Sequence, residues 1–337
     1  MVKLGKNARS VSIVGVGCTP FKDFETHPET QGIGEGEAFG YAALEAIADA
    51  GLEPRDVDFF YHGSANPYLV GACITPNLPV ADCIGMRAKG SVHHSEACCT
   101  GYVALEQAVM AVASGTYDVV LSGACDLAST LPVEHQPSHI RQDFPLSVMI
   151  PSLDKIYDRA YGRPLDGAFG VSFDNWINEY SMQYDIDADK IDDALNGLTK
   201  SLRRGAVANP LAWYETTVEQ DAKANGFATA DEYLKSMYNP KVTQYLRVTG
   251  FEKKCDGAAA LVVMPTEKAL AMGVPHTPIE VLGTGASAVV AGLVHNEHWA
   301  TKVAAQQFYE LTGVSPDEVD LFIWNDLFLA SEIVYAE

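Results

Sequence analysis

Hydrophobic and polar positions follow two alternating patterns through the first 127 residues. Short apolar runs typical of buried strands cover Ser10–Val16, Val57–His62, Ser91–Cys98 and Val119–Cys125. Between them, Glu37–Ala50 and Gly101–Ala113 carry apolar residues at helical spacing, and the first of these predicted helices ends at Gly51. Strands that alternate with helices predict an α/β fold with a mostly parallel sheet covered on both faces.

Part of this pattern recurs near the C-terminus. The segment 43–60 and the segment 305–322 both contain a predicted helix, a glycine stop, a proline turn and a strand. Upstream of each, two glycines stand at the same spacing: Gly15 and Gly17, and Gly283 and Gly285. Because the two segments stay in step over ten positions, they predict a duplicated α/β half.

Residues 128–255 have a different character, since they are richer in Pro, Tyr, Trp and charge. Helices are predicted over Phe173–Gln183 and Asp189–Arg204. We interpret this region as a loop domain inserted into the fold, a common form for binding loops and lids. The predicted organisation is a first half at 8–127, the insertion at 128–255 and a second half at 256–337.

Charge and cysteine content exclude several classes of protein. The formal net charge of -21 argues against a nucleic-acid or anionic membrane surface, because both need Lys and Arg patches. The 7 cysteines form no paired C-x-x-C motif, so no metal site is predicted, and a reducing cytoplasm fits them best. No apolar run approaches the length of a membrane span, and neither glycine pair completes a dinucleotide-binding motif.

The candidate nucleophile is Cys98, which a polar, strand-like run delivers to the first turn of an apolar helix. Unpaired N–H groups and the positive end of the helix dipole favour a thiolate there, and a thiolate suits covalent catalysis. The neighbouring Cys99 is interpreted as a small packed side chain.

The duplicated half, the Cys98–Gly101 motif, the long insertion and the run Cys255–Ala260 together resemble the thiolase superfamily. The segment Ser12–Phe21 is most similar to the sterol-carrier-protein-type thiolases and their lipid-transfer relatives. The resemblance implies a thiolase fold, a five-layer α/β/α/β/α arrangement of two similar halves. It also implies that Cys98 is acylated, and that Asn325, in the block Asn325–Ala330, holds a water in an oxyanion hole.

One departure concerns the general base. Thiolases continue beyond this block to a Gly-His-Pro motif whose histidine activates the cysteine, whereas this sequence stops at Glu337. A sheet without its last strands would leave an exposed edge, so we expect further residues or a disordered segment rather than altered chemistry.

Several other polar residues are candidates for the site, and some of them have a second, structural interpretation. His62 ends a predicted strand and either contacts the thiol or substrate or is a surface histidine. His93 and His94 fit an interface or core, and His135 and His139 are candidates for the acyl pocket. The cluster Lys200, Arg203 and Arg204 is either a solvated helix end or a cradle for the coenzyme A phosphates.

The resemblance therefore implies an acyl-CoA C-acyltransferase. It would cleave or form a 3-oxoacyl-CoA through a Cys98 thioester. No cofactor is expected, because coenzyme A is a substrate. The reverse reaction is a Claisen condensation, and the aromatic insertion favours a bulky or aromatic acyl group. Expected partners are a second copy of the chain and a small OB-fold, zinc-binding companion. The alternatives are a retro-aldolase acting on CoA thioesters, which needs no nucleophilic cysteine, and a non-catalytic acyl-CoA or lipid carrier.

Overall fold

The computed structural model describes residues 8–65, 75–127, 165–250, 255–287, 300–325 and 329–336. His135 and His139 lie outside these residues. The chain divides into two compact units. Unit 1 comprises Met1–Val133, Lys254–Gly285 and Gln306–Ser315, and unit 2 comprises Glu134–Lys253, Ala286–Ala305 and Pro316–Glu337.

Unit 1 is built on a mixed sheet of six strands in the order β3-β2-β4-β5-β1-β6. The strands are β1 (Val11–Cys18), β2 (Phe59–Gly63), β3 (Gly90–His94), β4 (Val120–Asp126), β5 (Gly257–Pro265) and β6 (Ile279–Glu280). The four strands predicted in the first half are all present, and β2 pairs in parallel with β3 and β4. The prediction of a mostly parallel sheet was wrong, however. Strand β5 is antiparallel to both β4 and β1, and β1 is antiparallel to β6.

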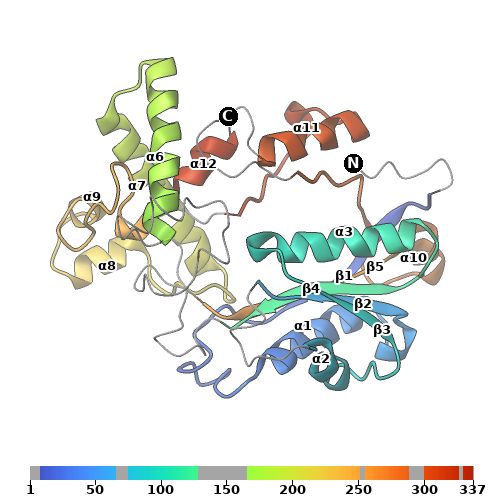
Figure 1. Ribbon diagram of the computed structural model, residues 1–337. Coiled ribbons are helices and arrows are strands. Elements are labelled where there is room, and N and C mark those ends of the chain that lie inside the picture. Colours follow the sequence, from blue (N-terminus) through green and yellow to red (C-terminus); the bar gives the residue numbers. More distant parts are fainter. Residues whose placement is uncertain are drawn as a thin grey trace. The chain divides into compact units, whose positions relative to one another are not determined.

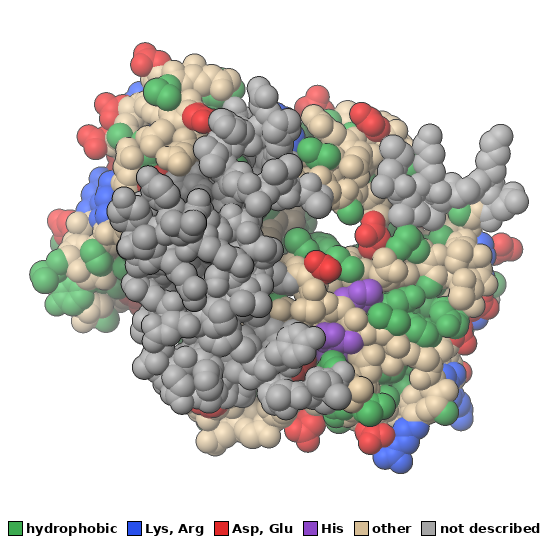
Figure 2. Space-filling model, viewed as in Figure 1, with side chains coloured by type: hydrophobic (Ala, Val, Ile, Leu, Met, Phe, Trp, Pro, Cys, Tyr) green, Lys and Arg blue, Asp and Glu red, His purple; other side chains and the backbone are tan. Residues whose placement is uncertain are grey.

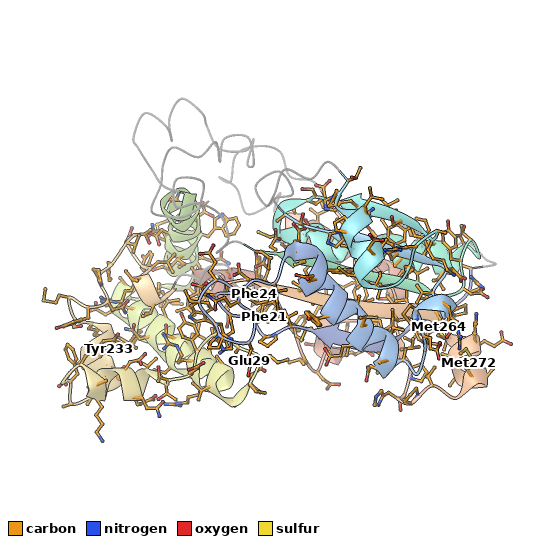
Figure 3. The ribbon with its side chains drawn as sticks, turned by 90° about the horizontal axis from the view of Figure 1, so that it is seen from below. Phe21, Phe24, Glu29, Tyr233, Met264 and Met272 are labelled. Atoms are coloured by element: carbon orange, nitrogen blue, oxygen red, sulfur yellow. The ribbon has the colours of Figure 1, made fainter. Side chains whose placement is uncertain are left out.

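The position of β5 also bears on the domain boundary. The sequence assigns this strand to the start of the second half, whereas it lies in the middle of the sheet of unit 1. Its apolar residues suit that place, since Val262, Val263 and Met264 are fully buried. Asp256 fixes the chain where the insertion ends, because its carboxylate accepts the N–H of Phe24 at 2.8 Å. Figure 3 labels Phe24 beside Phe21.

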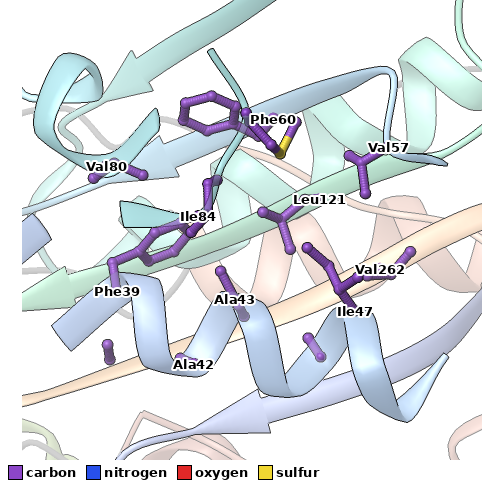
Figure 4. Close-up of a cluster of buried hydrophobic side chains, with 14 of the residues drawn as sticks. Phe39, Ala42, Ala43, Ile47, Val57, Phe60, Val80, Ile84, Leu121 and Val262 are labelled. Carbon is purple, nitrogen blue, oxygen red and sulfur yellow. The ribbon is translucent and has the colours of Figure 1, made fainter. Parts of the chain in front are cut away.

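Helices cover both faces of this sheet, as Figure 1 shows. Helices α1 (Glu35–Asp49) and α2 (Asn77–Cys83) lie on one face, and α3 (Thr100–Ala113) lies on the other. Alanines on α1 bring the helix close to the sheet, and the core between them is drawn in Figure 4. Its buried residues include Phe39, Ala42, Ala43, Ile47, Val57, Phe60, Leu121 and Val262. A second cluster, with Val109, Val112 and Val120, packs under α3. The short helix α10 (Thr266–Met272) follows β5.

Unit 2 is helical within its described residues. It contains α6 (Leu165–Tyr184), α7 (Ala188–Ala208), α8 (Val218–Ala224), α9 (Ala230–Leu234) and α12 (Leu329–Ala336). Both helices predicted in the insertion are confirmed, and α6 begins earlier than predicted. A small core holds α6, α7 and α12 together, with Trp176, Ile177, Leu195, Leu246 and Leu329 buried.

The turn geometry supports the predicted duplication. Helix α1 is followed by Gly51 at φ 70° and the 3₁₀ turn η1 (Pro54–Asp56). Helix α11 (Ala300–Thr312) is followed by Gly313 at φ 74° and the 3₁₀ turn η6 (Pro316–Glu318). Both glycines adopt the left-handed conformation that ends a helix, which other residues rarely adopt. The copies then differ, because β2 follows η1 whereas residues 319–325 form no strand in the described chain.

Candidate active site

Cys98 lies in a turn at the carboxyl end of the sheet. It is exposed in the 3₁₀ turn η2 (Ala97–Cys99), which runs directly into α3, and Cys99 is the N-cap residue of that helix. The buried Thr100 closes the turn, since its hydroxyl accepts the N–H of Glu96 at 2.9 Å. The turn follows β3, and sites in α/β sheets assemble at the carboxyl ends of such parallel strands.

The exit of β2, residues Gly63, Ser64 and Ala65, anchors this turn. The Ser64 N–H donates to the His94 carbonyl at 3.2 Å, and the Ser95 hydroxyl donates to the Ala65 carbonyl at 3.3 Å. At Gly63 there is no room for a Cβ, because the methyl group of Thr100 occupies the space. The exit segment of β2 therefore fixes the backbone on both sides of Cys98.

The same segment is held from β4 by Asp126. Its carboxylate accepts the Ala65 N–H at 3.0 Å. Asp126 is the last residue of β4, which pairs with β2, so the ends of three neighbouring strands and the start of α3 meet around Ala65 and Cys98.

Buried polar side chains lie behind the exit segment. His62 is fully buried, with its ring 4.6 Å from that of Phe39 and 5.2 Å from that of His93. Its Nε2 lies 3.9 Å from Oε1 of Glu35, the first residue of α1. Within the described residues neither ring nitrogen makes a well-formed hydrogen bond, although Asn77 lies close to the ring. These orphan polar atoms call for an explanation, because burying a polar group without a partner is costly.

The protonation states of Glu35 and His62 lower the cost of burying these polar side chains. Burial, reinforced by the negative charge of Asp126, raises the pKa of Glu35 to about 7. Burial and the neighbouring His93 lower the pKa of His62 to about 3. Near neutral pH the imidazole of His62 is therefore uncharged, and the Glu35 carboxyl changes its protonation state in this range. Perturbed groups of this kind cluster at functional sites.

Ser64 and His93 continue the cluster toward the surface. Ser64 lies close to the Glu35 carboxyl, and its hydroxyl lies 3.2 Å from Nε2 of His93. His93 and His94 are half-buried on β3, the edge strand of the sheet. Histidine and hydrophobic side chains lie next to each other on the face that Figure 2 shows.

The predicted catalytic residues are distributed over both units. His62 is in unit 1 with Cys98, and its full burial differs from the surface position that the sequence left open. Asn325 is exposed in unit 2, directly before residues 326–328, which lie outside the described part of the chain. The roles of Cys98, His62 and Asn325 stay predictions.

The three cations of the predicted phosphate cradle form ion pairs with carboxylates within unit 2. Lys200 Nζ lies 2.7 Å from Asp231, Arg203 lies 2.8 Å from Asp221, and Arg204 lies 2.5 Å from Glu219. Arg203 also stacks on Tyr214, with its guanidinium carbon 3.5 Å from the ring centroid. A phosphate would have to compete with these carboxylates for the three cations.

The sequence did not single out Glu35 and Asp126. An acidic residue at a helix start is usually read as a solvated partner of the helix dipole, and that is the only signal Glu35 gives. Asp126 directly follows the apolar run of β4, and a carboxylate at the carboxyl end of a parallel strand is a usable signal.

The described residues contain neither a metal-ligand cluster nor a membrane-spanning helix. No group of three or more His, Cys, Asp and Glu side chains in them is placed to hold a metal ion. No helix among them has both the length and the apolar character needed to cross a membrane.

Comparison with known proteins finds relatives along nearly the whole chain. No protein-family model matches it. The chain is 25% identical to an acetyl-CoA acetyltransferase of Methanocaldococcus jannaschii, over 98% of this chain and 75% of that protein. It is 26% identical to the benzoylsuccinyl-CoA thiolase subunit BbsB of Thauera aromatica, over 98% and 76%. A steroid side-chain-cleaving aldolase of Thermomonospora curvata is 25% identical, over 95% and 74%.

Solved structures give the same fold. The Ltp2-ChsH2(DUF35) aldolase matches with a TM-score of 0.67 and 22% identity, covering 97% of this chain and 75% of that one. The acetyl-CoA acetyltransferase from Syntrophomonas wolfei matches with a TM-score of 0.68 and 19% identity, covering 98% and 82%. The α/β thiolase fold predicted from the sequence is thereby confirmed, and the similarity to acetyl-CoA acetyltransferases and a thiolase subunit of the thiolase superfamily extends over 98% of the chain.

Proposed function

We propose that the protein is an acyl-CoA C-acyltransferase that cleaves or forms a 3-oxoacyl-CoA through a thioester on Cys98. The observation that carries this proposal is the exposed Cys98 in the turn entering α3, at the carboxyl ends of β2, β3 and β4. Support comes from an acetyl-CoA acetyltransferase and a thiolase subunit, which are 25% and 26% identical to this chain over 98% of its length. We place the reaction in the cytoplasm, where such a thiol stays reduced.

In the cleavage direction the Cys98 thiolate attacks the β-carbonyl carbon of the 3-oxoacyl-CoA and forms a C–S bond. The bond between the α and β carbons then breaks, and its electron pair leaves as the enolate of acetyl-CoA, which takes up a proton. The thiol of a second coenzyme A attacks the thioester, releases the shortened acyl-CoA and returns the proton to the enzyme. The N–H groups at the start of α3 favour the thiolate.

Two further assignments complete the proposal. Asn325 would stabilise the developing oxyanion through a water that it holds, an interaction of the kind that contributes about 3 kcal/mol. Lys200, Arg203 and Arg204 would bind the phosphates of coenzyme A, with the paired carboxylates moving aside.

Turnover of a 3-oxoacyl-CoA with added coenzyme A tests this function. We expect Cys98→Ala to lower kcat at least about 1000-fold, because the nucleophile is lost. The matched control, Cys99→Ala, changes the adjacent thiol and should keep kcat within a few-fold. Equal activity of Cys98→Ala and the wild type would contradict the proposal.

A second candidate, a retro-aldolase acting on CoA thioesters, is favoured by two of the similar proteins, since both are named aldolases. An aldol cleavage releases a free carbonyl compound, consumes no coenzyme A and forms no thioester with the enzyme. Cleavage of a β-hydroxyacyl-CoA that persists in Cys98→Ala would support this candidate over acyl transfer.

We also propose that the chain works with partners. The name Ltp2-ChsH2(DUF35) and the subunit designation of BbsB indicate that those relatives are parts of larger assemblies. For this chain we propose a homodimer that binds a small OB-fold, zinc-binding companion. Light scattering of the purified protein, alone and mixed with such a companion, measures both associations, and a monomer under both conditions would contradict them.

A further inference from the structure

A small cavity lies within the core of the helical unit, among the side chains that hold α6, α7 and α12 together. It is lined by α7, by the segment that ends in the 3₁₀ turn η4 (Val248–Gly250), and by Leu329, the first residue of α12. Leu246 and Leu329 are buried and supply apolar parts of the wall. All of the lining residues belong to unit 2, so the cavity is a feature of that unit alone.

One polar group on the wall of this cavity lacks a hydrogen-bond partner among the described residues. Asn196, in the middle of α7, is only 4% exposed, and its side-chain nitrogen makes no hydrogen bond there. Burying an N–H donor without an acceptor is costly, and buried donors in native proteins almost always have one. Asn196 therefore needs an acceptor that the described part of the chain does not supply.

Oxygen atoms that could complete a hydrogen-bonded site line the same cavity. Asp192, Asn196 and Thr199 stand at helical spacing, so they share one face of α7. The carboxylate of Asp192 accepts two bonds from Arg247, at 3.0 and 3.3 Å. The Thr199 hydroxyl donates to a backbone carbonyl of α7 at 2.9 Å. Because carboxylate and hydroxyl oxygens have further lone pairs, both groups can each accept one more hydrogen bond.

The size and the polarity of the cavity suit one small neutral molecule. About 10 Å³ is open to the centre of a water-sized molecule, which is close to the room that one bound water needs. A cation would meet the N–H groups of Asn196, and an anion would meet the carboxylate of Asp192. A molecule that both accepts and donates hydrogen bonds fits these groups better than an ion.

We propose that one ordered water molecule binds in this cavity. It accepts the side-chain N–H of Asn196 and donates its two hydrogens to the Thr199 hydroxyl and the Asp192 carboxylate. Three hydrogen bonds are the usual number for a buried water. With its polar face satisfied in this way, α7 can pack against the apolar Leu329 of α12 without leaving a donor unpaired. The inference is independent of the proposed function, because none of these residues takes part in the chemistry at Cys98.

The direct test is a crystal structure of the protein at a resolution that shows individual waters. We expect one density peak in the cavity, within hydrogen-bonding distance of the Asn196 side-chain nitrogen and of at least two other polar atoms. Asn196→Leu should lack this peak, because leucine has the branched shape of asparagine but no N–H group. A wild-type cavity without density for a water would overturn the inference.

Denaturant unfolding of the same two proteins gives an independent test in solution. If a water pairs with Asn196, Asn196→Leu loses those hydrogen bonds, and the equilibrium constant for unfolding should rise roughly 2- to 10-fold. If the donor has no partner, its removal relieves an unfavourable burial, and the same substitution should lower the constant. A lower or unchanged constant in Asn196→Leu would overturn the inference.

Two further variants separate loss of the water from other effects of the substitution. Ala194→Leu is the matched control, because Ala194 is exposed on α7 and does not line the cavity. Its unfolding constant should stay within about 2-fold of the wild type. Asn196→Ala removes the donor without overfilling the cavity, so it should also raise the constant, and it replaces Asn196→Leu if that variant does not fold. A constant that rises in Asn196→Leu but falls in Asn196→Ala would indicate steric crowding and overturn the inference.

Discussion

Glu35 and His62 show how a single residue acquires a property that its sequence position does not reveal. Glu35 follows Gly34 at the start of a helix, where acidic side chains are usually solvated. Here the ends of β2 and β4 meet the side chain and bury it beside His62 and Asp126. Only the fold brings these segments together, so the pair could not be predicted from spacing along the chain.

The stability of the protein should therefore depend on pH through Glu35. Its pKa is about 7 in the folded protein and 4.5 ordinarily, so its contribution to folding is complete below pH 4.5 and is lost as the pH rises through 7. Glu35→Gln cannot ionise. Its free energy of unfolding should equal that of the wild type near pH 4 and exceed it by up to about 3 kcal/mol near pH 8.

Denaturant unfolding of both proteins at a series of pH values measures this difference, with Glu37→Gln as control. His62 acts in the opposite direction: its pKa is lowered to about 3, so its contribution is present above pH 6.5 and is lost as the pH falls through 3. A constant difference between Glu35→Gln and the wild type across the range would contradict the buried acid.

Gly63 is a second residue whose role comes from contact rather than from its backbone angles. A Cβ there would collide with the methyl group of Thr100. Gly63→Ala should lower the free energy of unfolding by about 1–3 kcal/mol, as overpacking does. Thr100→Ser removes the methyl group and keeps the oxygen that accepts the Glu96 N–H. The double variant should recover part of the loss in denaturant unfolding, and strictly additive effects would contradict the contact.

At the scale of elements, predictions succeed where neighbours in sequence are neighbours in space. The pattern of helix, glycine, proline turn and strand defines α1, η1 and β2 locally, and the same local signals identify α11 and η6. Strand β5 follows a long insertion, and nothing in its own apolar sequence indicates that it runs antiparallel between β4 and β1. The prediction of a mostly parallel sheet was wrong for that reason.

The junction of α7 and α8 gives a prediction at this scale. Arg203 is only 10% exposed, donates to Asp221 and to the Thr216 carbonyl, and stacks on Tyr214. Arg204 is 62% exposed and pairs with Glu219. Arg203→Ala should destabilise the protein by about 2 kcal/mol, whereas Arg204→Ala should cost less than about 1 kcal/mol. Equal losses in thermal or denaturant unfolding would contradict this division of roles.

For the whole molecule, the sequence motifs predicted the thiolase fold correctly because each marks a different structural element. Cys98 marks the start of α3, the run from Gly257 marks β5, and the two glycine stops mark the duplicated turns. The chain aligns with 75% of an acetyl-CoA acetyltransferase, and its described residues show the sheet and helices of one α/β unit together with a helical unit. Cys98 and His62 lie in unit 1 and Asn325 lies in unit 2, and their catalytic roles stay predictions.

The most direct test of the central claim is the intact mass of the protein before and after incubation with acetyl-, succinyl- and benzoyl-CoA. Acylation of Cys98 predicts an adduct with the mass of one acyl group. The adduct should be absent from Cys98→Ala and retained in Cys99→Ala, and the most effective donor indicates the acyl class. An adduct that persists in Cys98→Ala, or no adduct from any donor in the presence of the companion protein, would contradict the assignment of Cys98 as the nucleophile.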